Sequence, residues 1–298
     1  MSDLADLFPG FSSHHIGTPN GHVFARVKGD GEPLILVHGF PQTHVMWHKI
    51  APELAKTRRV IAFDLRGYGW SSVVKESRGG SGYSKRAMGE DILSIADEFG
   101  LTQFTLLGHD RGARVSYRFA LDHPGRVKKL ALLDIIPTYQ VWDRMNAEAA
   151  MRVYHWPFLA QAEPIPETLI GADPRMWQES CLAGWTAAKD LKSFDGRALS
   201  HYRAFFNDPS RIHATCEDYR AGATIDLAHD RESLAKGETI TCPTLVLWGE
   251  KGIPAGKSSP LDAWKALAPK AIGQAIHAGH FLPEENPDDT LAALKAFL

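Results

Sequence analysis

The sequence has few cysteines, no excess of positive charge and no long apolar run, and each of these absences argues against a class of protein. Its three cysteines, Cys181, Cys216 and Cys242, are an odd number without the spacing of a metal site. We therefore expect buried apolar thiols in a reducing compartment, none of them catalytic. The 33 Lys and Arg against 35 Asp and Glu leave a net charge of -2, so no strong positive field is expected to attract nucleic acid or an anionic membrane.

Signals for export, membrane insertion and cofactor binding are also missing. Residues 1–11 contain no basic start followed by an apolar core, and the longest apolar runs, such as 130–136, fall far short of the roughly 20 residues that span a bilayer. No GxGxxG sequence follows a predicted strand, and neither a Walker nor an HExxH sequence occurs. We expect a cytoplasmic protein that acts on a small molecule, without a metal or an organic cofactor.

The first 136 residues alternate between strand-like and helix-like stretches, which is typical of an α/β fold with a mostly parallel sheet. The run PLILV at 33–37 is continuously apolar, as a strand buried on both faces requires. In the stretch 85–100, Met88 and Ile92 recur at helical spacing and Gly100 can end the helix. The expected strands are 22–27, 33–37, 60–64, 104–107 and 127–136, and the expected helices are 46–55, 85–100 and 113–121.

The alternation stops after residue 136 and resumes near residue 241. Residues 137–240 hold aromatic-rich, helix-like stretches broken by Pro and Gly, without a convincing buried strand, so we expect an inserted helical cap. The core would then comprise 1–136 and 241–298, with the ligand pocket between core and cap. Beyond the cap we expect strands at 243–248 and 271–277, a helix at 261–267 and a closing helix that begins at Asn286 and Pro287.

Asp110 lies in the sequence Gly-His-Asp-Arg-Gly at 108–112, between a predicted strand and a predicted helix. This is the context of a nucleophile elbow, in which the glycines permit the sharp turn. Because an ordinary aspartate has a pKa of about 3.9, it is ionised at pH 7 and can attack a saturated carbon without a base. The alternative is a turn or N-cap aspartate, and the partners described next favour the nucleophile.

A base and an acid follow Asp110 in the chain order that such hydrolases use. His280 lies in the loop between the last predicted strand and the closing helix, the expected place of a base that activates water. Asp134 ends an apolar strand, where an ionised carboxylate is costly unless it has a partner, so it is our first choice for the acid. A buried hydrogen-bonding role is its alternative, and Glu250, after strand 243–248, ranks second as the acid.

Four motifs together resemble the haloalkane dehalogenase and epoxide hydrolase branch of the α/β-hydrolase fold: HGFP at 38–41, DLRGYG at 64–69, GHDRG at 108–112 and GH at 279–280. Within this branch the sequence is most similar to the fluoroacetate dehalogenases. The resemblance covers essentially the whole chain, and it implies that Asp134, not Glu250, is the acid and that the protein is a homodimer. The matching positions are Asp110, Arg111, Arg114, Asp134, His155, Trp156, Trp185, Tyr219 and His280.

Arg111 and Arg114 lie three residues apart in the first turn after Asp110, on one face of the predicted helix. Two cations at a helix N-terminus oppose the macrodipole, at about 0.3–1 kcal/mol each, so their presence there needs a reason. A substrate carboxylate held by both guanidinium groups is one reason. The alternatives are ion pairs with Asp110 or Asp134, or a place on the surface. With the resemblance, we expect a carboxylate clamp.

The predicted cap carries side chains that can donate hydrogen bonds to a departing halide. His155, Trp156 and Tyr219 match the donors that the resemblance implies, and none brings a second anion into the pocket. Aromatic residues of a helical cap more commonly pack its core, so this assignment depends on the resemblance. Trp185 is expected to be a wall or gate of the pocket.

The expected reaction converts a haloacetate to glycolate and halide through an ester of Asp110, and fluoroacetate is the first-choice substrate. His280, held by Asp134, would activate the hydrolytic water, and the backbone N–H groups of Phe40 and Arg111 would form the oxyanion hole. An epoxide hydrolase is the nearest alternative.

That alternative needs an additional acidic donor. Tyr154 or Tyr202 would then join Tyr219 as the proton donor of an epoxide hydrolase. A non-catalytic ligand-binding protein on a hydrolase scaffold is the alternative from another class. A serine esterase is disfavoured because the elbow holds no serine.

Overall fold

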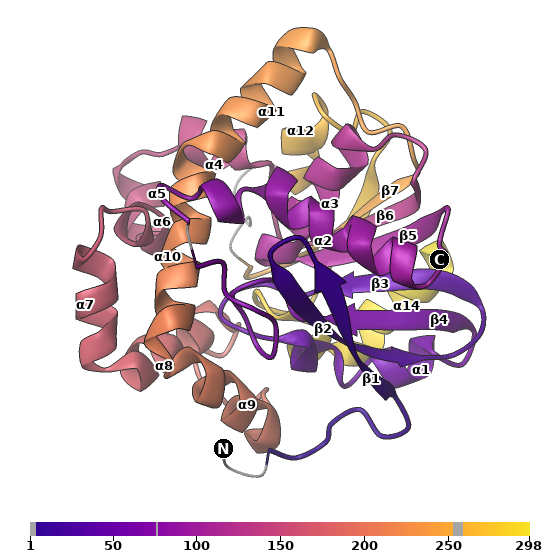
Figure 1. Ribbon diagram of the computed structural model, residues 1–298. Helices are drawn as coiled ribbons and strands as arrows, with labels where there is room; N and C mark the ends of the chain where they lie inside the picture. Colours follow the sequence, from indigo (N-terminus) through magenta and orange to yellow (C-terminus); the bar gives the residue numbers. More distant parts are fainter. Residues whose placement is uncertain (1–3, 76, 253–258) are drawn as a thin grey trace.

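The computed structural model describes residues 4–75, 77–252 and 259–298, and its centre is a sheet of eight strands in these residues (Figure 1). The strand order is β1-β2-β4-β3-β5-β6-β7-β8, in which β1 and β2 run antiparallel to their neighbours and the other strands are parallel to one another. The expectation of a mostly parallel α/β sheet is confirmed. The bounds are β1 Ser12–Thr18, β2 Gly21–Lys28, β3 Glu32–Val37, β4 Arg58–Phe63, β5 Phe104–His109, β6 Val127–Leu133, β7 Thr244–Gly249 and β8 Ile272–Ile276.

Helices cover both faces of the sheet, as parallel strands require. Ser84 caps helix α2, Lys85–Glu98, because its side chain accepts from the N–H of Ala87, and Gly100 beyond the end of this helix has a φ of 63°. Asn286 caps the closing helix by accepting from the N–H of Asp289, as expected. The helices outside the insertion are η1 His44–Trp47, α1 Ala51–Leu54, η2 Ser81–Tyr83, α2 Lys85–Glu98, α3 Asp110–Asp122, α12 Pro260–Trp264, α13 Leu282–Glu285 and α14 Pro287–Phe297.

Three local expectations differ most from the structure. The strand expected at 127–136 is β6, which ends at Leu133, so Asp134 follows this strand. The single helix expected at 46–55 is instead the 3-10 turn η1 followed by the short helix α1. Pro52 explains the break, since proline lacks an N–H and is tolerated only in the first turn of a helix. Strand β1 was not expected, because it is a largely exposed edge strand without a run of buried apolar residues.

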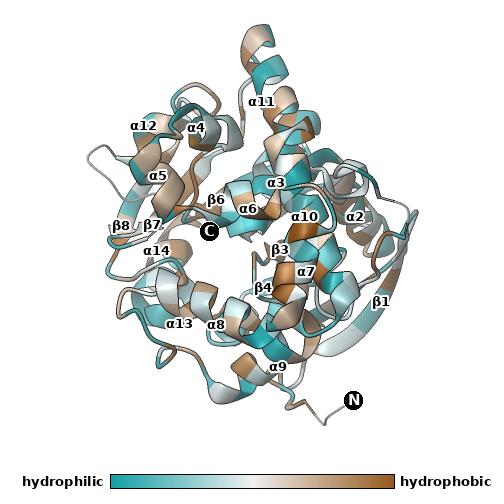
Figure 2. Ribbon diagram, turned by 90° about the vertical axis from the view of Figure 1, so that its left-hand side faces the viewer, coloured by the Kyte–Doolittle hydropathy of each residue, from teal (hydrophilic) through white to brown (hydrophobic). Residues whose placement is uncertain are grey.

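Eight helices lie between β6 and β7, and no strand occurs in residues 134–243, all of which the structure describes. We call residues 138–236 the helical insertion. Figure 2 shows the molecule from the side on which the insertion lies, and the helices there carry both hydrophilic and hydrophobic residues. Its buried residues do not form a separate core, because Tyr219 and Ile212 join the same apolar cluster as Phe40. The helices are α4 Thr138–Asp143, α5 Ala147–Arg152, α6 His155–Leu159, α7 Ile165–Ala172, α8 Pro174–Trp185, α9 Gly196–Phe206, α10 Pro209–Ala223 and α11 Ile225–Lys236.

The expected division into a core of 1–136 and 241–298 and a cap of 137–240 stays a prediction. Among the described residues, no helix is both long and apolar enough to cross a membrane.

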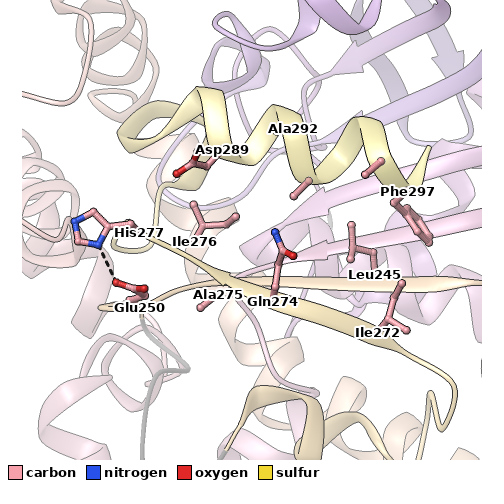
Figure 3. Close-up of a pocket in the computed structure, with 12 residues that line it drawn as sticks. Leu245, Glu250, Ile272, Gln274, Ala275, Ile276, His277, Asp289, Ala292 and Phe297 are labelled. Carbon is pink, nitrogen blue, oxygen red and sulfur yellow. Dashed lines mark hydrogen bonds and ion pairs between the residues drawn. The ribbon is translucent and has the colours of Figure 1, made fainter.

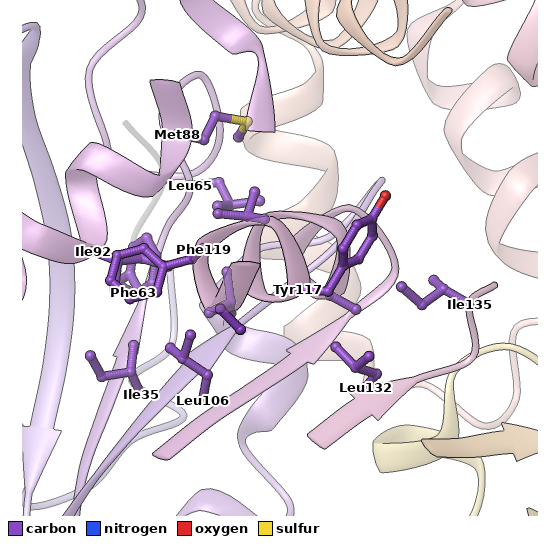
Figure 4. Close-up of a cluster of buried hydrophobic side chains, with 14 of the residues drawn as sticks. Ile35, Phe63, Leu65, Met88, Ile92, Leu106, Tyr117, Phe119, Leu132 and Ile135 are labelled. Carbon is purple, nitrogen blue, oxygen red and sulfur yellow. The ribbon is translucent and has the colours of Figure 1, made fainter. Parts of the chain in front are cut away.

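Alternate residues of the central strands pack on opposite faces of the sheet, because successive strand side chains point to opposite sides. Ile35 of β3 lies in the cluster of Figure 4, together with Leu106, Leu132, Met88 of α2 and Phe119 of α3. Its neighbours Leu34 and Leu36 join the second cluster, on the other face, with Leu107 and Leu133. Each such side chain stabilises the fold by about 1.5–3 kcal/mol on burial. The carboxyl ends of β3, β5 and β6 are thereby fixed side by side.

Candidate active site

Asp110 follows β5 directly and is the first residue of α3. Its φ of 46° is unusual for a residue with a side chain and marks a strained turn. The flanking glycines are needed for close approach: a Cβ on Gly112 would lie 2.2 Å from the carbonyl oxygen of His38, and one on Gly108 would lie 2.6 Å from the Cα of Ala113. The segment 108–112 therefore forms the strand-turn-helix elbow that the sequence predicts.

The carboxylate of Asp110 is buried and held from one side. Its Oδ1 accepts from the backbone N–H of Phe40 at 3.0 Å, in the loop after β3. Among the hydrogen bonds between described residues, none joins the backbone N–H of Arg111 to Asp110. Of the two predicted oxyanion donors, Phe40 therefore contacts the carboxylate of Asp110 and Arg111 does not. Burial raises the pKa of Asp110, but the positive fields of His280, His109, Arg111 and Arg114 outweigh it and leave the pKa below its ordinary value. Asp110 is therefore a carboxylate near neutral pH.

His280 lies between two carboxylates. Its Nδ1 is 2.6 Å from Oδ2 of Asp134, whereas its Nε2 is 3.8 Å from Oδ2 of Asp110 and has no hydrogen-bond partner among the described residues. Burial lowers the pKa of His280, but the hydrogen bond and charge of Asp134, and then the charge of Asp110, raise it above its ordinary value. The second oxygen of Asp134 accepts from the N–H of Gly249 at 2.8 Å. Asp134 thus orients the ring so that Nε2 faces Asp110.

Glu250, the second candidate for the acid, lies elsewhere. Its carboxylate is 2.8 Å from Nδ1 of His277, and both side chains are mostly exposed. The first choice from the sequence, Asp134, is the carboxylate that contacts His280.

Arg111 and Arg114 are buried, so the alternative of surface residues is wrong for both. Arg111 donates from Nε and Nη2 to the carboxylate of Asp218, at 3.0 and 2.7 Å, and pairs with neither Asp110 nor Asp134. Arg114 donates from Nη1 to the carbonyl of Ile136 and to Thr138. Each arginine keeps one buried nitrogen without a partner among the described residues, Nη1 of Arg111 and Nε of Arg114. Both cations therefore retain hydrogen-bonding capacity for an anion.

The predicted aromatic donors gather beside these arginines. The ring centroid of Tyr219 lies 5.7 Å from those of His155 and Trp156. The guanidinium of Arg111 is 4.2 Å from the Tyr219 ring, and that of Arg114 is 4.4 Å from the Trp156 ring. The hydroxyl of Tyr219 and Nδ1 of His155 are buried without a partner among the described residues. These groups can donate to a ligand because no protein acceptor occupies them.

The protonation of these donors follows from burial. Burial lowers the pKa of His155 to about 3, so its imidazole is neutral and carries one N–H. Burial, and then the charge of Asp110, raise the pKa of Tyr219 well above its ordinary value, so its hydroxyl keeps its proton.

Trp185, the predicted wall or gate, is half-buried at the end of α8. Its ring centroid lies 4.4 Å from that of His155, 5.7 Å from that of His280 and 5.8 Å from that of Phe40. It therefore connects the insertion to the elbow region.

Three buried residues at the site were not predicted: Asp218, Lys85 and Tyr68. The carboxylate of Asp218 accepts from Lys85 as well as from Arg111, and from the hydroxyl of Tyr68 at 3.1 Å. The fields of Arg111 and Lys85 overcome burial and hold the pKa of Asp218 well below its ordinary value. The only signal in the sequence was an acidic pair beside Tyr219, which fits a solvated helix face equally well.

A surface groove of about 690 Å³ lies between β8 and α14, away from the elbow (Figure 3). Glu250 and His277 stand at one end of it, and Ile272 and Phe297 line the other. Across the described ranges, no three His, Cys, Asp or Glu side chains form a group suited to hold a metal ion.

Comparison with known proteins fits this geometry. The sequence matches the family described as alpha/beta hydrolase fold over residues 32–287. The chain belongs to this family. A fluoroacetate dehalogenase from Burkholderia sp is 40% identical to this hydrolase, over 98% of the chain and 95% of the relative. A soluble epoxide hydrolase from Corynebacterium sp. strain C12 is 31% identical, over 96% of the chain and 97% of the relative.

The fold comparison agrees. A crystal structure from Nostoc sp PCC 7120, described as that of an α/β hydrolase, superposes on this hydrolase with a TM-score of 0.94 and 49% identity, covering 97% of this chain and 98% of the other. The predicted fold class and the resemblance to this branch of hydrolases are confirmed.

Proposed function

We propose that this α/β-hydrolase is a hydrolytic dehalogenase that converts a haloacetate, with fluoroacetate first, to glycolate and halide through an ester of Asp110. The observation that carries the proposal is the buried, ionised carboxylate of Asp110 at the elbow, next to two buried arginines that each keep an unpartnered N–H. The 40% identity to a protein named fluoroacetate dehalogenase supports the same substrate class.

Substrate binding would use the two arginines. The carboxylate of a haloacetate accepts from Nη1 of Arg111 and Nε of Arg114, in charge-assisted bonds. Because these residues follow Asp110 in the first turns of α3, a bound carboxylate places its α-carbon near the nucleophile. Substrates without a carboxylate would lack this orientation.

In the first step, Oδ2 of Asp110 attacks the α-carbon, because Oδ1 is held by the N–H of Phe40. A carbon–oxygen bond forms while the carbon–halogen bond breaks, and the halide leaves with the bonding electrons. His155, Trp156 and Tyr219 would donate to the departing halide, a contribution that matters most for fluoride.

In the second step, Nε2 of His280 takes a proton from water, and the resulting hydroxide attacks Cγ of Asp110. The negative charge that develops on Oδ1 is stabilised by the N–H of Phe40, and by that of Arg111 after a small adjustment. On collapse, the proton held on His280 passes to the departing oxygen of glycolate. The second proton of the water, left on the carboxyl group of Asp110, is released to solvent, which restores the carboxylate. Esterification removes the charge of Asp110, which is one cause of the raised pKa of His280, so the neutral base becomes more available when it is needed.

An epoxide hydrolase remains the alternative, since a relative of that name is 31% identical. Such an enzyme would need a second acidic donor beside Tyr219. The hydroxyl of Tyr202 already donates to Glu284 at 3.2 Å, and Tyr154 is 44% exposed with its ring against Trp177. Neither arrangement supports an epoxide-opening pair, and the two arginines favour an anionic substrate.

A non-catalytic ligand-binding protein on this scaffold is disfavoured by Asp110, His280 and Asp134 all being in place. It would bind haloacids tightly without releasing halide.

The variant His280→Gln, incubated with chloroacetate, tests the proposal. We expect one equivalent of chloride and one carboxymethyl group on the peptide that contains Asp110, because the ester forms but is not hydrolysed. A folded variant that binds the acid yet carries no adduct would sink the mechanism. Halide release from haloacetates, compared with diol formation from an aryl epoxide, separates the two activities in the parent enzyme.

The homodimer implied by the resemblance also stays a proposal. Large apolar side chains are exposed on the insertion, among them Met151, Ile165 and Leu169, and they offer a surface for a second copy. Light scattering on the purified enzyme tests this expectation.

A further inference from the structure

The loop that carries His280 joins β8 to α13, and its backbone is bonded on both sides of the catalytic base. The N–H of His280 donates to the carbonyl of Trp185 at 2.9 Å. The carbonyl of His280 is 2.8 Å from Nε2 of the buried His109, the residue before the nucleophile. The position of the imidazole is therefore defined by the insertion and by the elbow, in addition to Asp134.

Glu285 adds a third support, which none of the steps above uses. Its carboxylate accepts from three backbone N–H groups: Oε2 from Gly279 at 2.9 Å and Ala187 at 2.8 Å, and Oε1 from Phe281 at 2.9 Å. We call these three bonds the Glu285 clamp. Gly279 and Phe281 are the immediate neighbours of His280, and Ala187 lies two residues after Trp185. The clamp thus ties the base loop to the segment that carries the predicted gate.

The two clamped segments touch backbone to backbone. A Cβ on Gly279 would lie 2.4 Å from the backbone nitrogen of Ala187. In addition, none of the ion pairs between described residues involves Glu285. The carboxylate is therefore satisfied by backbone donors, an arrangement that fixes the position of the chain and does not pair a cation.

We propose that Glu285 is a positioning residue for the hydrolysis of the ester, holding Nε2 of His280 at the distance from Asp110 that the attacking water requires. This inference rests on the proposed function. The first step uses Asp110 and the arginines, which the clamp does not touch. The second step depends on His280, so loss of the clamp slows the second step selectively.

Glu285→Gln is the most informative variant, because glutamine has nearly the same shape but only one acceptor oxygen. Whichever way the amide turns, its NH2 group faces at least one of the three N–H donors and repels it. A displacement of the base by roughly 1 Å can cost about 10²-fold in rate. With chloroacetate, we expect kcat to fall by about that factor, a burst of chloride of one equivalent per site, and an ester on Asp110 in the steady state.

Glu250→Gln is the matched control. It removes an exposed carboxylate whose partner, His277, precedes His280 by three residues, and it leaves the three bonds of the Glu285 clamp unchanged. It is expected to behave as the parent. Accumulation of ester in this control too would overturn the proposal, because loss of charge alone would then explain the effect.

The remaining outcomes separate the two proposals. If His280→Gln forms no ester, the proposed function fails, and the role of Glu285 fails with it. If His280→Gln forms the ester but Glu285→Gln turns over like the parent, or slows without ester, only the role of Glu285 is overturned. The amplitude of the chloride burst counts active sites, so partial unfolding cannot imitate the result. Should Glu285→Gln not fold, Glu285→Asp, which keeps the charge and stretches the three bonds, is expected to accumulate ester in the same assay.

Discussion

Replacing Asp218 by asparagine tests how Arg111 is held for the proposed binding of a substrate carboxylate. Asp218 accepts from Arg111, Lys85 and Tyr68 in a cluster that is almost fully buried, and Lys85 is also 3.4 Å from Asp226. The formal charges of Asp218, Arg111, Lys85 and Asp226 sum to zero, and the substitution leaves one uncompensated positive charge. We therefore expect a loss of both stability and substrate orientation.

The size of the stability loss follows from the burial of the pair. Breaking a buried ion pair by removing one partner costs about 3–5 kcal/mol. A chain of 298 residues has an unfolding entropy of about 0.6 kcal/mol/K, at roughly 2.1 cal/mol/K per residue, so Tm should fall by about 5–8 °C. A total stability of about 5–15 kcal/mol leaves the variant folded at low temperature.

The effect on binding should be separable from the effect on stability. Arg111 loses the charge-assisted bidentate contact that aims its free Nη1, so KM for chloroacetate should rise by about tenfold or more. The second substitution Lys85→Met removes the surplus charge, and should recover part of the Tm without recovering KM. Lys85→Met alone completes the cycle.

Differential scanning fluorimetry and steady-state chloride release measure the two effects. An unchanged Tm, or a KM equal to that of the parent, would refute the reasoning that Asp218 holds Arg111 for substrate binding.

Three further predictions concern the other titratable groups. Asp134→Asn should lower the rate of ester hydrolysis by about 10⁴-fold, because the amide favours the wrong tautomer of His280. Glu250→Gln should leave this rate within a factor of about two to three. If Glu250→Gln had the larger effect, Glu250 and not Asp134 would be the acid. Asp110→Asn should lower the pKa of His280 measured by NMR, since it removes a charge that raises this pKa, and an unchanged value would contradict the coupling. Burial raises the pKa of Glu284 from its ordinary value of 4.5 to about 8. The free energy of unfolding therefore falls as the pH rises from about 4.5 to about 8, because the unfolded chain loses this proton more readily than the folded one. Glu284→Gln should then raise Tm more at about pH 9 than at about pH 5, and a gain that does not depend on pH would argue against a neutral Glu284.

Much of the fold was predictable because its signals are local. Continuous apolar runs mark β3 and β6, and Asn286 with Pro287 marks the start of α14. The exceptions are also local. β1 is an exposed edge strand with little burial pattern, and Pro52 divides a stretch that otherwise reads as one helix.

The site divides in a similar way. The elbow at 108–112 was predictable because its glycines and its place between strand and helix are adjacent in sequence. The roles of His155 and Tyr219 came only from resemblance, since aromatic residues in helices ordinarily pack a core. The ranking of Asp134 over Glu250 came from a burial argument and the resemblance, and the structure places Asp134 against His280.

By itself, then, the sequence determined the α/β class and the elbow, because these depend on neighbours a few residues away. It predicted the nucleophile, base and acid from their chain order and from the resemblance. Tertiary structure alone decided that Asp218 holds Arg111 and that Glu285 clamps the loop of His280. Arg111 and Asp218 are 107 residues apart in the sequence, and Glu285 is 98 residues from Ala187, one of its three donors. Hydrogen bonds at such separations leave no periodic or adjacent pattern, because they exist only once packing has brought the segments together.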